Sequence, residues 1–303
     1  MNEPSKAMKA VLDRLAVEDA GLLDPTELPS DAGRALAALS NLRWNRDLPD
    51  VAEARTVMID DMPARYIVPH EECGTDAILH VHGGGWAFCS AATHEGAARR
   101  LAIEAGAPVL TFEYRLAPEN PYPCALEDLL DVWQARDRSR RWSFAGDSAG
   151  ANLALAGMLR LLEEGGDLPA SGLLFYGVYG ADFTTPSYRD FADGPGLTRA
   201  KMQRFWNWYA PEEVRHLPAV APLQADDTQL RALPPLYLNA AGLDPLRSET
   251  EALAGRLGAL GRNDQFDLFP GVVHGFMQMA SILPEAQSAF AMAGRYFKQV
   301  TAQ

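Results

Sequence analysis

The segment FAGDSAGANLA, residues 144–154, places one serine between two glycines at the boundary of two predicted elements. Apolar residues precede the stretch from Gly146 to Gly150, and a helix-forming run follows it. Serine favours neither a strand nor a helix, whereas flanking glycines permit a bend too tight for side chains. Such a strand-to-helix turn would hold the Ser148 hydroxyl on its tip, so the segment predicts a nucleophilic serine.

Alternating strand and helix patterns surround this turn. Apolar strands are predicted at residues 77–84, 107–116, 141–146, 172–180, 234–242 and 264–271, and helices at 93–106, 125–137, 151–164 and 248–261. We expect Thr93 to open the first of these helices and Gly106 to close it. Residues 55–69 predict two short strands around a turn at Asp61 to Pro63. The alternation predicts an α/β fold, a central mostly parallel sheet covered by helices on both faces.

One segment is longer than a crossover connection requires. Thr198 is expected to cap a helix there whose apolar face is Met202, Phe205, Trp206 and Tyr209. We interpret residues 1–50 and an insertion at about 182–217 as a helical cap over a catalytic domain at 51–303. An ordinary crossover helix followed by a loop is the alternative.

Composition excludes several function classes. The 303 residues carry a formal charge of -13, which would repel the phosphates of a nucleic-acid partner. The three cysteines are odd in number and form no CxxC pair, which is typical of a reducing compartment and not of a disulfide framework or a thiol-ligated metal site. No signal-peptide core and no apolar run of membrane-spanning length is present, so we expect a cytoplasmic protein without stable membrane insertion.

A serine hydroxyl needs a base and an orienting carboxylate to attack a carbonyl group. Two histidines follow Ser148 in the chain, His216 beside charges in PEEVRHLP and His274 in FPGVVHGF. His274 comes directly after the last apolar strand, where a loop could bring it to the carboxyl edge of the sheet, and it is the predicted base. A histidine with only a structural role in its loop is the alternative.

The predicted acid is Asp244, which directly follows the strand at 234–242. Ligand-facing residues gather at such strand ends in open α/β sheets. Asp226 and Asp227 lie in a polar loop and are interpreted as solvated surface. For Asp244, capping of a helix ahead of Pro245 is the alternative role.

The stretch HVHGGGWAF predicts the oxyanion hole, because consecutive glycines let backbone amides approach a ligand. The expected donors are the amides of Gly84, Gly85 and Ala149, the last at a helix N-terminus whose dipole favours negative charge. His82 and Gly83 are expected to be structural, with His82 steadying the loop by hydrogen bonds.

Five motifs occur in an order that resembles the bacterial hormone-sensitive-lipase-like (family IV) esterases of the α/β-hydrolase superfamily. They are HGGGW (82–86), YRLAPENPYP (114–123), GDSAG (146–150), DPLRSE (244–249) and VHGF (273–276). The resemblance implies Ser148 as nucleophile, His274 as base and acid, and Asp244 as the orienting residue. It also implies no cofactor, no metal, short acyl groups and frequent homodimers through an edge strand.

The chain departs from that family pattern at Cys89, Asn120, Ala151 and Ser248. Cys89 stands near the oxyanion loop, where thiol reagents could inhibit by crowding. Bulky Trp86, Phe88, Trp206 and Trp208 are expected to narrow the pocket for small acyl groups.

The predicted activity is therefore hydrolysis of short-chain carboxylic esters through an acyl-enzyme intermediate. The same three side chains would serve an amide or N-acyl substrate, as in a deacetylase or formamidase. A small-molecule receptor that has lost catalysis is a third interpretation, and the presence of His274 disfavours it.

Overall fold

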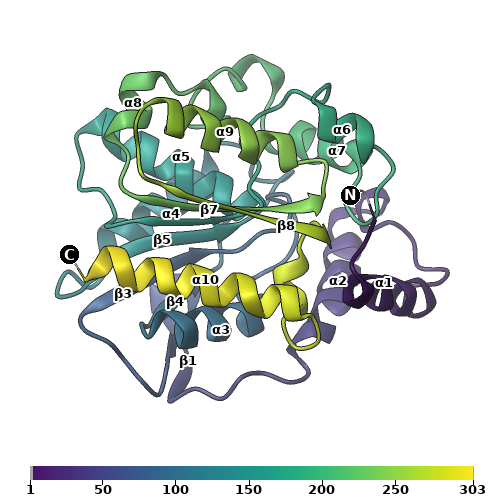
Figure 1. The fold of residues 1–303 in the computed structure, drawn as a ribbon, viewed down its shortest axis with the longest axis horizontal. Helices are drawn as coiled ribbons and strands as arrows, with labels where there is room; N and C mark the ends of the chain where they lie inside the picture. The colour runs from purple at the N-terminus through teal and green to yellow at the C-terminus, as the bar shows by residue number, and fades with distance from the viewer. Residues whose placement is uncertain (1–2, 303) are drawn as a thin grey trace.

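The computed structural model describes residues 3–302, which are built around one eight-stranded sheet (Figure 1). The strands are β1 Glu53–Ile59, β2 Met62–Val68, β3 Asp76–Val81, β4 Val109–Phe112, β5 Arg141–Asp147, β6 Gly172–Phe175, β7 Leu236–Leu243 and β8 Gln265–Val273. Their order is β1-β2-β4-β3-β5-β6-β7-β8. β2 pairs antiparallel with β1 and β4, and the pairs from β4 to β8 are parallel. The predicted fold class is confirmed.

Helices cover both faces of the sheet. They are α1 Lys6–Glu18, α2 Ser30–Leu42, α3 Glu95–Ala105, α4 Cys124–Ala135, α5 Ala149–Glu164, α6 Pro186–Asp190, α7 Arg199–Tyr209, α8 Asp227–Ala232, α9 Arg247–Ala259 and α10 Pro284–Thr301. Single 3-10 turns are η1 Pro25–Glu27, η2 Arg43–Asn45, η3 Glu212–Val214, η4 Pro222–Gln224 and η5 Phe276–Met279. None of the helices within residues 3–302 combines the length and the apolar character needed to span a lipid bilayer.

Alternation along the central strands produces two hydrophobic clusters, because successive side chains point to opposite faces. Phe144 and Leu238 belong to the cluster that includes α4, α5 and α9. Their neighbours Ala145 and Tyr237 belong to the cluster that includes α3 and α10. The sheet is thus a buried middle layer.

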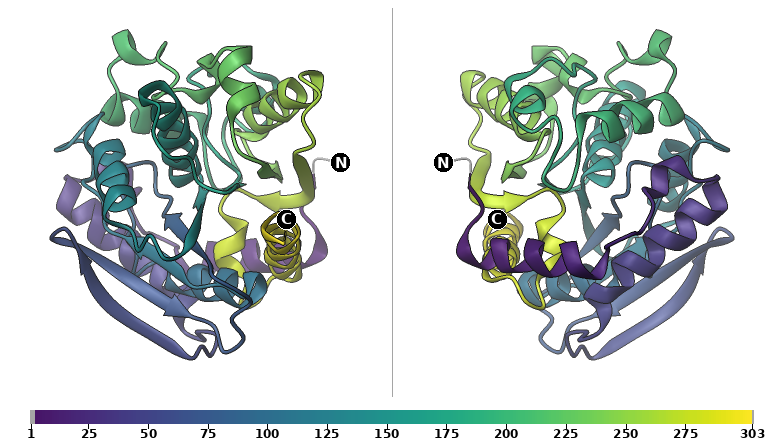
Figure 2. Two further views of the ribbon diagram at one scale, coloured as in Figure 1. Left: turned by 90° about the vertical axis from the view of Figure 1, so that its left-hand side faces the viewer. Right: turned by 90° about the vertical axis from the view of Figure 1, so that its right-hand side faces the viewer.

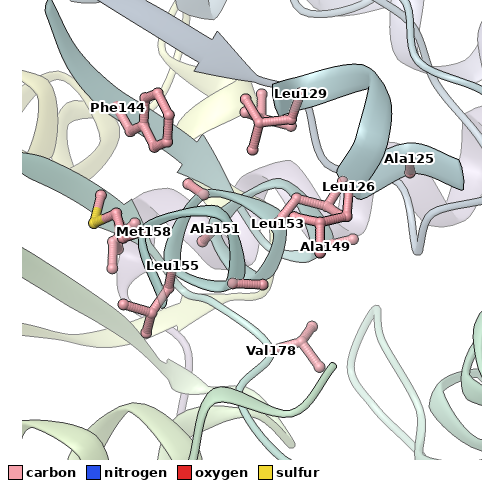
Figure 3. Packing of buried hydrophobic residues seen from close by; sticks show 14 of the residues in the cluster. Ala125, Leu126, Leu129, Phe144, Ala149, Ala151, Leu153, Leu155, Met158 and Val178 are labelled. Carbon is pink, nitrogen blue, oxygen red and sulfur yellow. The ribbon is translucent and has the colours of Figure 1, made fainter. Parts of the chain in front are cut away.

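Helix α5 packs closely against the sheet because small residues face its neighbours (Figure 3). A Cβ added at Gly157 would lie 2.9 Å from Cδ2 of Leu129 on α4. Ala149, Ala151 and Leu153 are fully buried in the first turns. This packing fixes the N-terminus of α5, where Ser148 lies.

Several predicted boundaries shift by a few residues. The hairpin turn is Asp60–Asp61, one residue earlier than expected, and both residues have positive φ, 44° and 66°. A two-residue turn with both φ positive matches the twist of the paired strands. The predicted strand at 107–116 ends at Phe112, and the one at 172–180 ends at Phe175.

The cap of α3 differs from the prediction. His94 is the N-cap residue, and the Thr93 hydroxyl accepts instead from the Ser90 amide at 2.9 Å, inside the preceding turn. Gly106 ends the helix with φ 61°, as expected.

Four helices gather where the parallel strands end. In Figure 1 the arrowheads of β7 and β8 point toward α1, α2, α6 and α7, and Figure 2 shows the N-terminal helices from the side. The Thr198 hydroxyl caps α7 by accepting from the Lys201 amide at 3.2 Å, as predicted. The four residues of its expected apolar face are buried: Met202, Phe205, Trp206 and Tyr209.

Candidate active site

Ser148 lies on a strained turn between β5 and α5. Its backbone has φ 55° and ψ -119°, a conformation that side chains rarely adopt and that is typical of functional turns. A Cβ at Gly146 would lie 2.4 Å from the Gly150 carbonyl oxygen, and one at Gly150 would lie 2.0 Å from that of Val81. Both flanking glycines are therefore required by close backbone contacts.

His274 lies between Ser148 and Asp244. Its Nε2 is 2.9 Å from Ser148 Oγ, and its Nδ1 is 2.7 Å from Asp244 Oδ2. Asp244 is 1% exposed and His274 13% exposed at their side chains. The three side chains come from the ends of β5, β7 and β8, and together they form one chain of hydrogen bonds.

Asp244 contacts His274 and the turn that follows it, but it does not cap a helix, because the N-cap residue of α9 is Leu246 and no side chain of the described residues caps that helix. Its Oδ1 accepts from the Leu246 amide at 2.9 Å, while Oδ2 faces His274. Asp226 instead caps α8 by accepting from the Gln229 amide, and His216 is exposed after η3. The structure thus brings Asp244 and His274 to the serine and leaves Asp226 and His216 in surface positions.

The glycine loop after β3 lines the same cavity as the serine. Gly84 and Gly85 have φ 119° and 61°, which favour glycine, and both line the cavity that contains Ser148. A Cβ at Gly85 would lie 2.6 Å from the Phe205 ring. Ala149 directly follows Ser148 and is the first residue of α5.

His82 and Gly83 shape this loop. His82 Nδ1 donates to the Gly83 carbonyl oxygen at 2.8 Å, and its ring stacks on Tyr114 at 4.2 Å. The Tyr114 hydroxyl in turn donates to the His82 carbonyl oxygen. Burial lowers the pKa of His82 to about 3, so its ring is neutral at pH 7.

A cavity of about 290 Å³ opens beside Ser148 and His274. The N-terminal segment and the α7 region contribute much of its wall: Asp24, Pro25, Thr26, Ala37, Asn41, Leu197, Lys201, Met202 and Phe205. Phe88 also lines it, as expected. Trp86 and Trp206 do not fit that expectation, because they are fully buried and pack with Tyr209 in the core.

The sequence patterns do not predict the buried polar cluster beside the glycine loop. Asp147 and His94 both line the cavity and are both buried, with Nε2 of His94 3.4 Å from Asp147 Oδ1. His80 Nε2 lies 3.8 Å from the same oxygen, Asp147 Oδ1. The position of Asp147 next to Ser148 in the sequence could have marked it as a site residue. No sequence pattern connects Asp147 with His94.

A buried carboxyl on α9 holds the segment that follows β6. Glu249 Oε2 accepts from the amides of Tyr179 and Gly180 at 2.5 and 2.8 Å. Burial raises the pKa of Glu249 to about 8 against these hydrogen bonds. Ser248, where the family often has an acid, exchanges amide-to-hydroxyl hydrogen bonds with Ser187 at 3.1 and 3.0 Å.

Cys89 lines the cavity, and its φ is 67°. Burial and the nearby Asp147 carboxylate raise the pKa of its thiol to about 12. Within residues 3–302, no group of three or more His, Cys, Asp or Glu side chains could hold a metal ion.

Residues 78–278 match the family model described as the alpha/beta hydrolase fold. The chain is 34% identical over 258 residues to carboxylesterase NlhH of Mycobacterium tuberculosis, covering 80% of this chain and 81% of that protein. It is 33% identical over 234 residues to an ethyl acetate hydrolase of Pseudomonas putida, covering 74% and 73%. The structure of a hyperthermophilic esterase from the archaeon Pyrobaculum calidifontis superposes with a TM-score of 0.89 at 29% identity, over 99% of this chain and 100% of that one.

Proposed function

The chain belongs to the hormone-sensitive-lipase-like esterases of the α/β-hydrolase superfamily, and on this premise we propose that Ser148 is the nucleophile, His274 the base and Asp244 the orienting acid. The chain is a serine carboxylic ester hydrolase. The observation that supports these roles best is the position of His274, 2.9 Å from the Ser148 oxygen and 2.7 Å from an Asp244 oxygen.

Acylation begins when His274 Nε2 takes the proton of Ser148 Oγ while that oxygen bonds to the ester carbonyl carbon. Asp244 Oδ2 accepts a hydrogen bond from the Nδ1–H of His274, remains ionised and stabilises the imidazolium that forms. The tetrahedral intermediate collapses when the bond to the alkoxy oxygen breaks and His274 donates its Nε2 proton to the leaving alcohol. In the second half of the reaction, His274 takes a proton from a water molecule, whose oxygen attacks the acyl carbon. The bond to Ser148 Oγ then breaks, His274 returns the proton to that oxygen, and the carboxylic acid is released.

The negative oxygen of each intermediate is proposed to bind the amides of Gly84, Gly85 and Ala149. Gly84 and Gly85 line the cavity that contains Ser148, and Ala149 opens α5, whose N-terminal dipole favours an anion. Because the backbone already holds these donors in place, they do not have to reorient when charge develops on the oxygen. Losing one such donor typically lowers the rate by about 10²–10³-fold.

Short acyl groups are the proposed substrates. The cavity of about 290 Å³ is bounded by Phe88, Met202 and Phe205, which leave room for a small ester and little more. We propose that residues 1–50 and 182–217 form the cap over a catalytic domain at 51–303. The cavity walls contributed by Asp24 and Lys201, one from each cap segment, support this division.

The decisive test replaces the serine. Ser148→Ala should abolish hydrolysis of p-nitrophenyl acetate and butyrate while far-UV circular dichroism and melting temperature stay near those of the wild type. A panel of esters from two to twelve acyl carbons, beside matched amides, sets the chain-length limit and the ester-to-amide preference. Undiminished turnover by the alanine variant would refute the assignment.

We propose residence in a reducing compartment, the cytoplasm. Cys73, Cys89 and Cys124 are free thiols in the described residues. Trapping thiols during cell lysis in a denaturant, which exposes all three side chains, should leave all three alkylated, and recovery of a disulfide would contradict the proposal.

A homodimer through edge strand β8 is the proposed assembly. β8 ends the sheet beside β7 and exposes 42% of Leu268, an apolar side chain. The opposite edge, β1, carries the charged residues Glu53 and Arg55, which disfavour strand pairing between copies.

A further inference from the structure

Asp147 links the nucleophile turn to the glycine loop. It precedes Ser148 in the chain, takes no part in the proposed triad, and its Oδ1 accepts from the Gly83 amide at 2.9 Å. A Cβ at Gly83 would lie 2.6 Å from Asp147 Oδ2, so glycine is what allows this approach. Two segments that must be positioned relative to each other therefore meet at one buried carboxyl.

This carboxyl is ionised despite its burial. Burial raises the pKa of Asp147, but the neighbouring His94 and the hydrogen bond from the Gly83 amide outweigh burial, so the pKa lies well below the ordinary range. An ionised carboxylate at a buried site needs a positive partner, because an unpaired buried charge is strongly destabilising.

The hydrogen bonds around His94 identify it as that partner. The Thr93 hydroxyl donates its single hydrogen to the Ser90 carbonyl oxygen at 2.9 Å, so it can only accept from His94 Nδ1, 3.1 Å away. Nδ1 therefore carries a hydrogen. Nε2 faces the Asp147 carboxylate at 3.4 Å and must carry one as well. Both ring nitrogens of His94 therefore face acceptors, an arrangement that an imidazolium satisfies.

The neighbouring histidines do not supply this charge. Burial lowers the pKa of His80 to about 4 and that of His82 to about 3, so both rings are neutral at pH 7. His82 instead uses its Nδ1 hydrogen on the Gly83 carbonyl oxygen.

We propose that the His94–Asp147 ion pair is the positioning element of the oxyanion loop, an inference that rests on the proposed function. Asp147 holds the Gly83 N–H, and His82 holds the Gly83 C=O. In a trans peptide the next N–H points opposite to that C=O, so fixing Gly83 aims the Gly84 amide. Glycines at 83 to 85 would otherwise let this loop rotate, because each has wide conformational freedom.

The charge of His94 has a second effect. A bare carboxylate beside the nucleophile would repel the oxyanion that forms during acylation. Pairing Asp147 with an imidazolium neutralises the site, so the carboxylate can hold the loop without opposing the reaction. His94 and Asp147 are positioning residues, since they act through Gly83 and not on the reacting atoms.

The test compares His94→Leu, Asp147→Asn and the matched control His80→Gln, which alters the other imidazole facing the same carboxylate. Active-site titration with diethyl p-nitrophenyl phosphate, which phosphorylates the serine and releases one p-nitrophenol per site, gives the active-site concentration. We expect His94→Leu and Asp147→Asn to lower kcat per active site for p-nitrophenyl butyrate by about 100-fold, with KM within threefold of the wild-type value. The His80→Gln variant should keep kcat within threefold.

A short alkyl trifluoromethyl ketone supplies a readout that a merely structural role would not change. It adds to the serine and places an oxyanion in the hole, so its inhibition constant should rise by the same factor as kcat falls. Wild-type kcat per active site in His94→Leu, or an equal loss in His80→Gln, would overturn the inference. If Ser148→Ala instead retains activity, the proposed function itself fails, so the two failures are distinguishable.

Discussion

At the scale of single residues, backbone strain and tight glycine contacts concentrate around Ser148. Its φ of 55° is sustained because Gly146 and Gly150 let three segments pass within van der Waals contact. Strain of this kind costs on the order of 1–3 kcal/mol and persists only where the surrounding structure enforces it. The turn is therefore positioned by its neighbours, and its hydroxyl has one fixed direction.

Cys89 gives a prediction at this scale. Because its thiol pKa is about 12, the thiolate fraction at pH 8 is about 10⁻⁴, and alkylation should be slow. Iodoacetamide at pH 8 should label exposed Cys73 first, with ester hydrolysis retained. Peptide mass mapping beside activity assays measures this. Cys73→Ser is the control, and rapid labelling of Cys89 with loss of activity near pH 7 would contradict the prediction.

At the scale of elements, ionic contacts join η1 to α7 across the cavity mouth. Lys201 Nζ lies 3.4 Å from Asp24 Oδ2, and Arg204 lies 3.3 Å from Glu27 Oε1. Arg204 also donates to the Thr26 hydroxyl. These contacts join residues that are about 180 positions apart in the chain, and we name them the cap clasp.

Opening the cap clasp should relax the chain-length limit. Lys201→Met combined with Arg204→Met should raise kcat/KM for octanoyl relative to butyryl esters several-fold, since the mouth can then widen. Stability should change by about 1 kcal/mol or less, because exposed ion pairs contribute little. High salt screens these ion pairs, so it should also raise the wild-type kcat/KM for octanoyl relative to butyryl esters.

The matched control for the cap clasp is Arg14→Met, which breaks the exposed Arg14–Glu18 pair of α1, 2.7 Å long. Its chain-length profile should equal that of the wild type. An unchanged profile in the double variant would show that the clasp does not limit the substrate.

At the scale of the whole molecule, buried charge makes stability depend on pH. Glu249 is anchored between α9 and the segment after β6, and its pKa rises from 4.5 to about 8 on folding. Between these values the native state binds more protons at this site than the unfolded state. The contribution of Glu249 to stability is therefore greatest below pH 4.5 and falls as pH rises toward 8.

Glu249→Gln should remove this dependence. One pKa unit corresponds to about 1.4 kcal/mol, so the wild type should lose up to about 5 kcal/mol relative to the variant between pH 4.5 and 8. Urea unfolding across this range measures the difference. Glu251→Gln, on the exposed side of the same helix, is the control and should parallel the wild type. Parallel curves for Glu249→Gln as well would contradict the prediction.

Assembly is also a property of the whole molecule. If β8 pairs with its copy, sedimentation velocity should detect a dimer, and Leu268→Asp should shift it toward the monomer. Introducing a charge on an edge strand disfavours strand addition. Met58→Asp on the opposite edge, β1, is the control, and dissociation by that variant alone would place the interface elsewhere.

The sequence alone determined the fold class and the order of the motifs, and it named the three side chains that form the hydrogen-bonded chain of the candidate site. Period-two and helical patterns are local, so the alternation that predicts a parallel sheet is visible in short windows. Parallel strands share one carboxyl edge, which is why Ser148, Asp244 and His274 could each be named from the strand that precedes it.

Only the tertiary structure decided which partners these residues have. The contacts of Asp147 with His94, of Glu249 with the Tyr179 amide and of Lys201 with Asp24 join distant segments. Tertiary packing also decided where the aromatic side chains lie. Trp86 and Trp206 are buried in the core, whereas Phe205 lines the cavity. Local sequence patterns determine where turns form and which face of a helix or strand is apolar. Contacts between residues far apart in the chain depend instead on how whole helices and strands pack against one another.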